Sequence, residues 1–314
     1  MIIAYNLNIF LQLKSISRMS GRWKAVENQL NTSQQTNINF IEMSSISGGC
    51  INQAWKATDS SGKHWFIKEN SRDLLAMFEA EYSGLEEIHQ SQTIKVPKPI
   101  LVGNTDSFSY LVLEYIPLQN RVNHQATGQQ LAEMHMITAT DKQFGWHRNN
   151  TIGSTPQLNQ QNKNWTSFWK QQRLLPQLSL AKKRGYTNSA YDAGLKLADN
   201  LELFFQQYNP TPSLLHGDLW GGNCASDSAN NPVIFDPALY YGDRETDIAM
   251  TELFGGFNPI FYDAYNNAYP LDSAYKTRKT LYNLYHILNH YNLFGGGYAS
   301  QAESMTKQLL SEIS

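Results

Sequence analysis

The stretches HGDLWGGN (216–223) and IFDP (234–237) decide the fold class that we expect for this sequence. Asn223 stands five residues after Asp218, the spacing found in the catalytic loop of protein kinases, and Asp236 ends an apolar run, as a kinase metal-binding aspartate does. Amide and carboxylate oxygens suit Mg²⁺, whose other ligands are phosphates and waters. The pattern predicts phosphoryl transfer with Asp218 as the catalytic residue and Asn223 and Asp236 as metal ligands. The alternative is a tight turn that uses these residues only for its geometry.

Residues 39–118 have the pattern of a small lobe of strands with one helix. Two strand-like runs flank Ser47-Gly48-Gly49, a third follows the turn signal at 59–62, and FSYLVLEYIPL (108–118) indicates a buried strand. Glycine lets a backbone approach a phosphate closely, so Gly48 and Gly49 are candidate nucleotide-binding residues. An ordinary hairpin turn is the alternative at this position.

Lys68 ends the run Phe66-Ile67-Lys68, where kinases carry the lysine that pairs with the α- and β-phosphates of ATP. The helical period over residues 71–89 has an apolar stripe of Leu74, Phe78, Leu85 and Ile88. Glu81 occupies the missing step of that stripe. An unpaired buried carboxylate is costly, so we expect Glu81 to pair with Lys68. The alternative places Glu81 at the stripe edge, where it reaches water.

The segment LVLEYI (111–116) is interpreted as a strand entering a hinge between two lobes. In kinase-like folds this backbone offers adenine a carbonyl and an amide, here those of Glu114 and Ile116. Helical patterns dominate after residue 117. We therefore predict an α+β, protein-kinase-like bilobal fold with an ATP-binding N-lobe (21–116) and a mainly helical C-lobe (117–314). Residues 1–20 are interpreted as a dispensable extension, with an element docked on the first lobe as the alternative.

The composition narrows the function classes. The 314 residues are 41% hydrophobic and 12% aromatic, which excludes a disordered chain, and the net charge of −2 gives no footprint for nucleic acid or an anionic membrane. Residues 1–13 lack the basic start and small-residue cleavage site of a secretory signal, and no segment has membrane-spanning length. The two cysteines are typical of a protein in the reducing cytoplasm. We expect no nucleic-acid or membrane partner.

Other charged and histidine residues have structural interpretations. Asp243, Arg244, Glu245 and Asp247 form a dense cluster that we expect to be an ion-pair network anchoring the next helix, with substrate contact as the alternative. His135 is expected to be a core histidine that braces the catalytic loop.

The sequence resembles the fructosamine kinase (ketosamine 3-kinase) family, within the aminoglycoside-phosphotransferase-like branch of the protein-kinase-like fold. The match extends from about Trp23 to Tyr298. Its most specific segments are SISGGCIN (45–52), FIKEN (66–70), FEAE (78–81), VPKPI (96–100), LHGDLWGGN (215–223), VIFDPALYYGDRETDIAM (233–250), FGGF (254–257) and LNHYNLFGGGY (288–298). Trp220, the FGGF segment and LNHYN distinguish this family from other small-molecule kinases of the branch.

The resemblance implies an ATP- and Mg²⁺-dependent kinase that phosphorylates the 3-hydroxyl of a ribulosamine, erythrulosamine or fructosamine, on a free amine or on protein lysine. The product sheds the sugar, which implies a deglycation role. Trp220 would be an aromatic platform for the acceptor, and His290 is assigned equally to substrate contact or to core packing. A kinase for an aminoglycoside, choline or a sugar is the runner-up. A nucleotide-binding regulator without turnover is the third hypothesis.

Cys50 is a redox candidate because it follows the loop that we place over the ATP phosphates. An electropositive phosphate site lowers the pKa of a thiol and raises its reactivity. Some members of the resembling family with cysteine at this position behave as redox switches. The expected state is a monomer or a redox-linked homodimer, and a small residue that merely fills the turn is the alternative.

Overall fold

The computed structural model describes residues 21–46, 51–119 and 121–313. The chain forms two compact units. The first runs to Tyr82 and includes Pro97–Ile116, and the second comprises Ser83–Val96 and the chain from Pro117 onward. The predictions for Gly48, Gly49 and Cys50, and for the extension at 1–20, fall outside the described residues.

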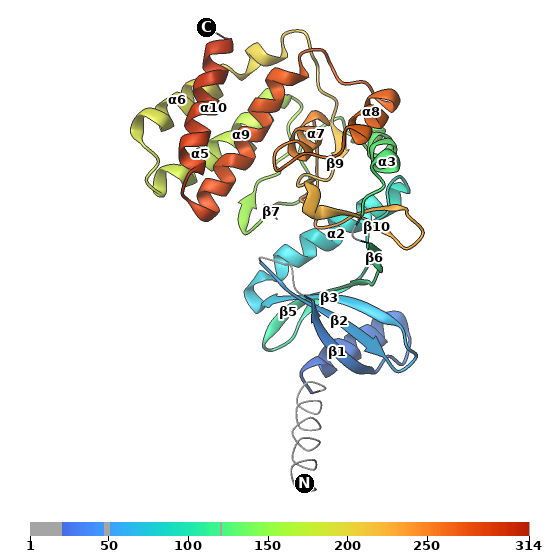
Figure 1. The fold of residues 1–314 in the computed structure, drawn as a ribbon. Coiled ribbons are helices and arrows are strands. Elements are labelled where there is room, and N and C mark those ends of the chain that lie inside the picture. Colours follow the sequence, from blue (N-terminus) through green and yellow to red (C-terminus); the bar gives the residue numbers. More distant parts are fainter. Residues whose placement is uncertain (1–20, 47–50, 120, 314) are drawn as a thin grey trace, which may run out of the picture. The chain divides into compact units, whose positions relative to one another are not determined.

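The first unit is built on a five-stranded antiparallel sheet in the order β1-β2-β3-β5-β4 (Figure 1). Its strands are β1 (Phe40–Ile46), β2 (Gln53–Asp59), β3 (His64–Ser71), β4 (Pro99–Asn104) and β5 (Phe108–Glu114). Six of the seven residues of β5 are buried, in keeping with the unbroken apolar run of its sequence. The register pairs Lys68 of β3 with Leu111 of β5, so Lys68 lies on the central strand of the sheet.

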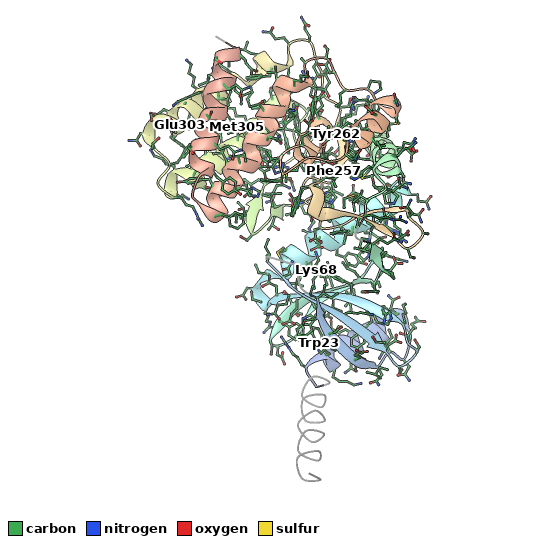
Figure 2. The ribbon with its side chains drawn as sticks, viewed as in Figure 1. Trp23, Lys68, Phe257, Tyr262, Glu303 and Met305 are labelled. Atoms are coloured by element: carbon green, nitrogen blue, oxygen red, sulfur yellow. The ribbon has the colours of Figure 1, made fainter. Side chains whose placement is uncertain are left out.

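A helix over residues 21–34, which the sequence analysis did not predict, completes the core of the first unit. Trp23, Val26 and Leu30 recur at helical spacing and are buried against Trp65 and Phe108 of the sheet. The ring centroids of Trp23 and Phe108 lie 5.2 Å apart, edge to face (Figure 2 labels Trp23). The helix therefore gives the sheet its hydrophobic cover on this side.

Helix α2 (Leu75–Ser91) belongs to both units and begins later than its stripe predicts. Leu74 lies in a preceding 3-10 turn, η1 (Arg72–Leu74), and is exposed, whereas Phe78, Leu85 and Ile88 are fully buried. The sequence analysis assigned all of 21–116 to one lobe, but 83–96 groups with the second unit. Lys95 illustrates the reason, because its ammonium pairs with a carboxylate of the second unit, at position 227, over 2.9 Å.

Helices dominate the second unit. The four helices α5, α6, α9 and α10 pack together, and α3 packs against α8 (Figure 1). The helices are α3 (His124–Met136), α4 (Trp165–Phe168), the π-helical η2 (Trp169–Leu174), α5 (Leu175–Lys183), α6 (Asn188–Asp199), η3 (Leu201–Phe205), η4 (Gly221–Asn223), α7 (Glu245–Thr251), α8 (Pro259–Ala268), α9 (Tyr275–Phe294) and α10 (Tyr298–Glu312).

Short strands position the catalytic motifs in the second unit. They are β6 (Leu118–Gln119), β7 (Asn150–Ile152), β8 (Thr155–Gln157), β9 (Ser213–Leu215), β10 (Cys224–Asp227), β11 (Pro232–Ile234) and β12 (Tyr240–Gly242). The order β11-β10-β6 forms one small sheet, and the pairs β12-β9 and β7-β8 form two others. The HGDLWGGN segment begins directly after β9, and IFDP begins at the last residue of β11, so two buried strands fix where both motifs start.

Within the part of the chain that the structure describes, none of the helices combines the length and apolar character needed to cross a membrane.

Candidate active site

The catalytic-loop backbone is held by a return of the chain after Asp236. The N–H of Ala238 donates to the carbonyl of His216 at 2.9 Å. Gly217 between them has φ +82°, and a Cβ added there would lie 2.1 Å from the Ala238 carbonyl oxygen. Only glycine combines that backbone conformation with so close an approach. The Gly of the H-G-D motif is therefore a steric requirement of this loop.

Asp247 of α7 anchors the same loop through hydrogen bonds to its backbone. Its two carboxylate oxygens accept the N–H groups of His216 and Gly217 at 2.7 and 2.8 Å. His135 of α3 approaches one of these oxygens at 3.1 Å, and its other ring nitrogen lies 2.8 Å from the hydroxyl of Tyr265. The prediction that His135 braces the catalytic loop is confirmed, and the bracing acts through Asp247.

The charge states of this anchor follow from its burial. Burial lowers the pKa values of His135 and His216, so both imidazoles are neutral near pH 7. Burial alone would raise the pKa of Asp247, but the hydrogen bond from His135 and the other contacts bring it below its usual value. Asp247 is therefore a permanent anion that fixes the loop.

Asp218 is half-buried in the loop that Asp247 holds. Its own backbone N–H donates to Nδ1 of His216 at 3.2 Å. Burial, together with the negative charges of Asp236 and Asp247, raises the pKa of the Asp218 carboxyl to about 7. A carboxylate whose pKa lies near the working pH can take a proton from a hydroxyl group.

The two predicted metal ligands follow the loop. Asn223 is buried and uses its amide nitrogen within the loop, donating to the Asp218 carbonyl at 2.9 Å and toward its carboxylate at 3.4 Å. The predicted ligand of Mg²⁺ is the other amide atom of Asn223, its side-chain carbonyl oxygen. Asp236 is exposed and has φ +59°, a left-handed conformation that is strained for a residue with a side chain.

This donor set fits Mg²⁺. Among the described residues no group of three or more His, Cys, Asp or Glu side chains could enclose a metal. One amide oxygen and one carboxylate suit a cation that is completed by substrate phosphates and water. The backbone brings the two segments together, because the N–H of Phe235, which precedes Asp236, donates to the Asn223 carbonyl at 3.1 Å.

The structure brings both predicted acceptor-binding residues to one group of rings. The indole of Trp220 lies over Gly222, where an added Cβ would be 2.4 Å from the ring, and 40% of the Trp220 surface is exposed. Phe254 lies between Trp220 and His290, with ring centroids at 6.5 Å from the first and 4.7 Å from the second. His290 is partly buried and its ring packs against Phe254, while its contact with the substrate stays a prediction.

The predicted lysine–glutamate pair is present in the first unit. Nζ of Lys68 lies 2.5 Å from Oε1 of Glu81, and both side chains are nearly buried, with 7% and 11% exposed (Figure 2 labels Lys68). The ion pair confirms that Glu81 faces inward from its helix.

The predicted hinge residues end the first unit. Glu114 is the last residue of β5, has an exposed side chain, and donates its backbone N–H to the Lys98 carbonyl at 2.9 Å. Ile116 is partly buried and is the last residue of this unit. The amide of Glu114 is therefore used within the unit, and binding of adenine by the Glu114 carbonyl and the Ile116 amide stays a prediction.

The acidic cluster before α7 is structural. Asp243, Arg244 and Glu245 are all buried. Arg278 of α9 donates to both oxygens of Glu245 at 2.7 and 3.0 Å, and the hydroxyl of Tyr282 donates to Asp243 at 2.5 Å. These bonds join α7 to α9, as predicted for an anchoring network.

Residues 145–164 are rich in Asn and Gln, and the sequence analysis missed a buried network of amide side chains there. Gln157, which is 1% exposed, donates to the carbonyl of Ala238 at 2.9 Å and to Oδ1 of Asn150 at 2.9 Å. Its carbonyl oxygen accepts from the hydroxyl of Tyr285 at 2.8 Å. Asn150 in turn donates to the Leu239 carbonyl at 2.8 Å. The network therefore holds the segment after Asp236 against α9. Its only sequence signal is the local excess of amides.

Comparison with solved structures shows which fold class the protein belongs to. A crystal structure of a choline kinase from Streptococcus pneumoniae has the same fold, with a TM-score of 0.58 at 15% identity over 93% of this chain and all of that one. A Haemophilus somnus protein assigned as a fructosamine-3-kinase gives a TM-score of 0.84 at 29% identity, covering 92% of this chain and 97% of that one. The molecule is an α+β protein with the protein-kinase-like fold of small-molecule phosphotransferases.

Sequence comparisons give the family within that class. The model of the fructosamine kinase family matches residues 22–312, and the chain belongs to this family. A probable ketoamine kinase of Synechocystis is 44% identical over 92% of this chain and 97% of its own. The chloroplastic protein-ribulosamine 3-kinase of Arabidopsis thaliana is 43% identical over 86% of this chain and 83% of its own.

Proposed function

We propose that this protein is an ATP-dependent ketosamine 3-kinase, which phosphorylates the 3-hydroxyl of ribulosamine, erythrulosamine or fructosamine adducts of amines. The observation that carries the proposal is the half-buried Asp218, set beside Asn223 in a loop whose backbone is anchored by Asp247. The names of the relatives, ketoamine kinase and ribulosamine 3-kinase, agree with this substrate class.

Asp218 performs the acid–base step in this proposal. Its carboxylate accepts the hydrogen bond of the substrate's 3-hydroxyl and takes the proton as that oxygen bonds to the γ-phosphorus of ATP. The bond between this phosphorus and the bridging oxygen breaks, and ADP leaves. The products are the ketosamine 3-phosphate and ADP. The raised pKa of Asp218 matches this role.

The other predicted site residues would hold the nucleotide. Lys68, oriented by Glu81, would bind the α- and β-phosphates, and the carbonyl of Glu114 with the amide of Ile116 would bind adenine. Gly48 and Gly49 stay predicted phosphate-loop residues.

Asn223 and Asp236 would hold Mg²⁺ through one oxygen each. The ion supplies charge neutralisation at the β- and γ-phosphates when it is bound.

Trp220 and His290 would bind the acceptor. An exposed indole offers a flat apolar face to a sugar-derived chain, and Trp220 follows Asp218 by two residues. Burial lowers the pKa of His290, so its imidazole is neutral near pH 7 and does not repel the cationic amine of a ketosamine.

Loss of the sugar from the 3-phosphate gives the enzyme a deglycation role. We also propose a reducing compartment such as the cytoplasm, which agrees with the buried free thiol of Cys224.

ATP consumption measured against a panel of acceptors tests the function. We expect turnover with ribulosamines, erythrulosamines or fructosamines and little with aminoglycosides or choline. Turnover confined to aminoglycosides or choline would replace the proposal by its runner-up. Nucleotide binding without turnover of any acceptor would favour the regulator.

A further inference from the structure

Five rings form a continuous surface in the second unit, here called the aromatic strip. It consists of Trp220, Phe254, His290, Phe294 and Tyr298. From Phe254 the strip reaches Trp220 at 6.5 Å and His290 at 4.7 Å between ring centroids. From His290 it continues to Phe294 at 5.7 Å and to Tyr298 at 5.2 Å. Each neighbouring pair lies within ring-contact distance.

The strip begins beside the catalytic aspartate and ends in solvent. Trp220 follows Asp218 by two residues. Helix α9, which carries His290 and Phe294, is connected to the same catalytic loop by hydrogen bonds. Its Tyr285 donates to Gln157, which donates to the carbonyl of Ala238, the residue whose N–H bonds the loop backbone. At the far end Phe294 is 66% exposed.

The chemistry of the strip suits a cation attached to an aliphatic chain. None of its five residues carries a full charge, because burial lowers the pKa of His290 and leaves that imidazole neutral near pH 7. Aromatic faces attract ammonium groups and pack against methylene groups. An exposed run of rings next to a reaction site is also unusual for a surface without a ligand.

The proposed substrate has such a group at a fixed place. In a ketosamine the amine nitrogen is joined to the carbon that bears the 3-hydroxyl through two further carbons. With that hydroxyl on Asp218, the nitrogen lies within about 5 Å of it. The substituent on the nitrogen must therefore leave along a surface that adjoins Asp218. The strip begins there.

We propose that the aromatic strip binds the substituted amine of the ketosamine, namely the ammonium group and methylene stem of a lysine residue in a peptide. Phe294 and Tyr298 contact the stem and the adjoining peptide, beyond the reach of an adduct of a short amine. The inference rests on the proposed ketosamine kinase function and adds the discrimination between glycated lysine and other glycated amines.

The test compares two substrates across a set of variants. The substrates are the ribulosamine of the lysine in a short peptide and the ribulosamine of methylamine, and the measured quantity is the ratio of their kcat/KM values. Phe294→Ala and Tyr298→Ala should each lower this ratio by about tenfold. Phe294→Trp, which keeps an aromatic face, should retain it.

Leu203→Ala is the matched control, because Leu203 is an exposed apolar side chain on η3, outside the strip, with 42% of its surface accessible. It should leave the ratio unchanged. Melting temperatures of all variants identify any that fail to fold. If Phe294→Ala fails to fold, Phe294→Trp shows whether an aromatic face at this position is enough to retain the ratio.

The outcomes separate the two claims. A ratio that stays the same in both alanine variants, with wild-type turnover of both substrates, overturns the role of the strip and leaves the kinase function intact. If wild type turns over neither ribulosamine, the same peptide and methylamine pair is measured as erythrulosamines and as fructosamines. Absence of turnover with all three sugars overturns the proposed function, and the inference with it.

Discussion

At the scale of single residues, the reactive groups depend on neighbours that touch no substrate. Asp218 stands in a loop whose shape requires Gly217, and Asp247 holds that loop through two backbone N–H groups. Asn223 uses its amide nitrogen to hold the Asp218 backbone, and its carbonyl oxygen is the proposed metal ligand. The proposed chemistry of Asp218 and Asn223 thus depends on hydrogen bonds that shape the loop.

The metal assignment predicts a defined change in magnesium dependence. Asn223→Ala and Asp236→Ala each remove one oxygen ligand, so the magnesium concentration for half-maximal nucleotide binding should rise at least tenfold. Isothermal titration of nucleotide at a series of magnesium concentrations measures it. Asp141→Ala, which changes an exposed carboxylate in a surface turn, is the control. A wild-type magnesium dependence in both site variants would remove these residues from the metal site.

At the scale of elements, the sequence predicted features whose partners follow from spacing. The ion pair between Lys68 and Glu81 follows from a strand position and a gap in an apolar helical stripe, and the structure confirms it. The catalytic loop and its bracing by His135 were likewise predictable. In both cases local period or motif spacing carries the information.

Other elements depend on partners that no local pattern reveals. Trp23 is buried by a sheet whose strands lie far along the chain, so the helix at 21–34 went unpredicted. Leu74 fits the stripe by period but is exposed, because the chain is still in a 3-10 turn there. Gln157 donates to the backbone at position 238 and accepts from the side chain at position 285, both more than eighty residues away. Amide side chains carry no signal of which distant backbone group they will bind.

The amide network predicts a coupled loss of stability and rate. Gln157→Leu would remove the side-chain donor of the Ala238 carbonyl and the Gln157 acceptor of the Tyr285 hydroxyl in the core, at a cost of about 2–5 kcal/mol in the free energy of unfolding. Because Ala238 also bonds the catalytic loop, kcat should fall more than the KM for ATP rises. Urea unfolding and steady-state kinetics measure both.

Gln161→Leu is the matched control, since its amide is exposed and donates to the surface residue Asp141. It should change the free energy of unfolding by less than about 0.5 kcal/mol. If Gln157→Leu lowered stability with wild-type kcat, the network would be purely structural.

At the scale of the whole molecule, buried neutral histidines make folding sensitive to acid. His286 of α9 is 4% exposed, its Nδ1 has no hydrogen-bond partner, and burial lowers its pKa from 6.5 to about 3. Above pH 6.5 the imidazole is neutral in both the folded and the unfolded chain, and stability is complete. Below pH 6.5 the unfolded chain binds a proton that the folded chain does not.

The free energy of unfolding should therefore fall by about 1.4 kcal/mol per pH unit from this residue, or about 2 kcal/mol between pH 6.5 and pH 5. Denaturant unfolding at several pH values measures the slope in wild type, in His286→Asn and in His89→Asn, an exposed control. His286→Asn should have the shallower slope. Equal slopes in all three proteins would show that His286 does not contribute.

The central claim is that Asp218 drives transfer of the γ-phosphoryl group of ATP to the 3-hydroxyl of a ketosamine. The direct measurement is ³¹P NMR of a ribulosamine incubated with ATP and Mg²⁺, using wild type and Asp218→Asn at equal nucleotide saturation. The account predicts a sugar 3-phosphate signal with wild type and a rate lower by about 10²–10⁴-fold in the variant, with ATP affinity retained. A phosphate ester at another position, or a variant rate close to that of wild type, would contradict it.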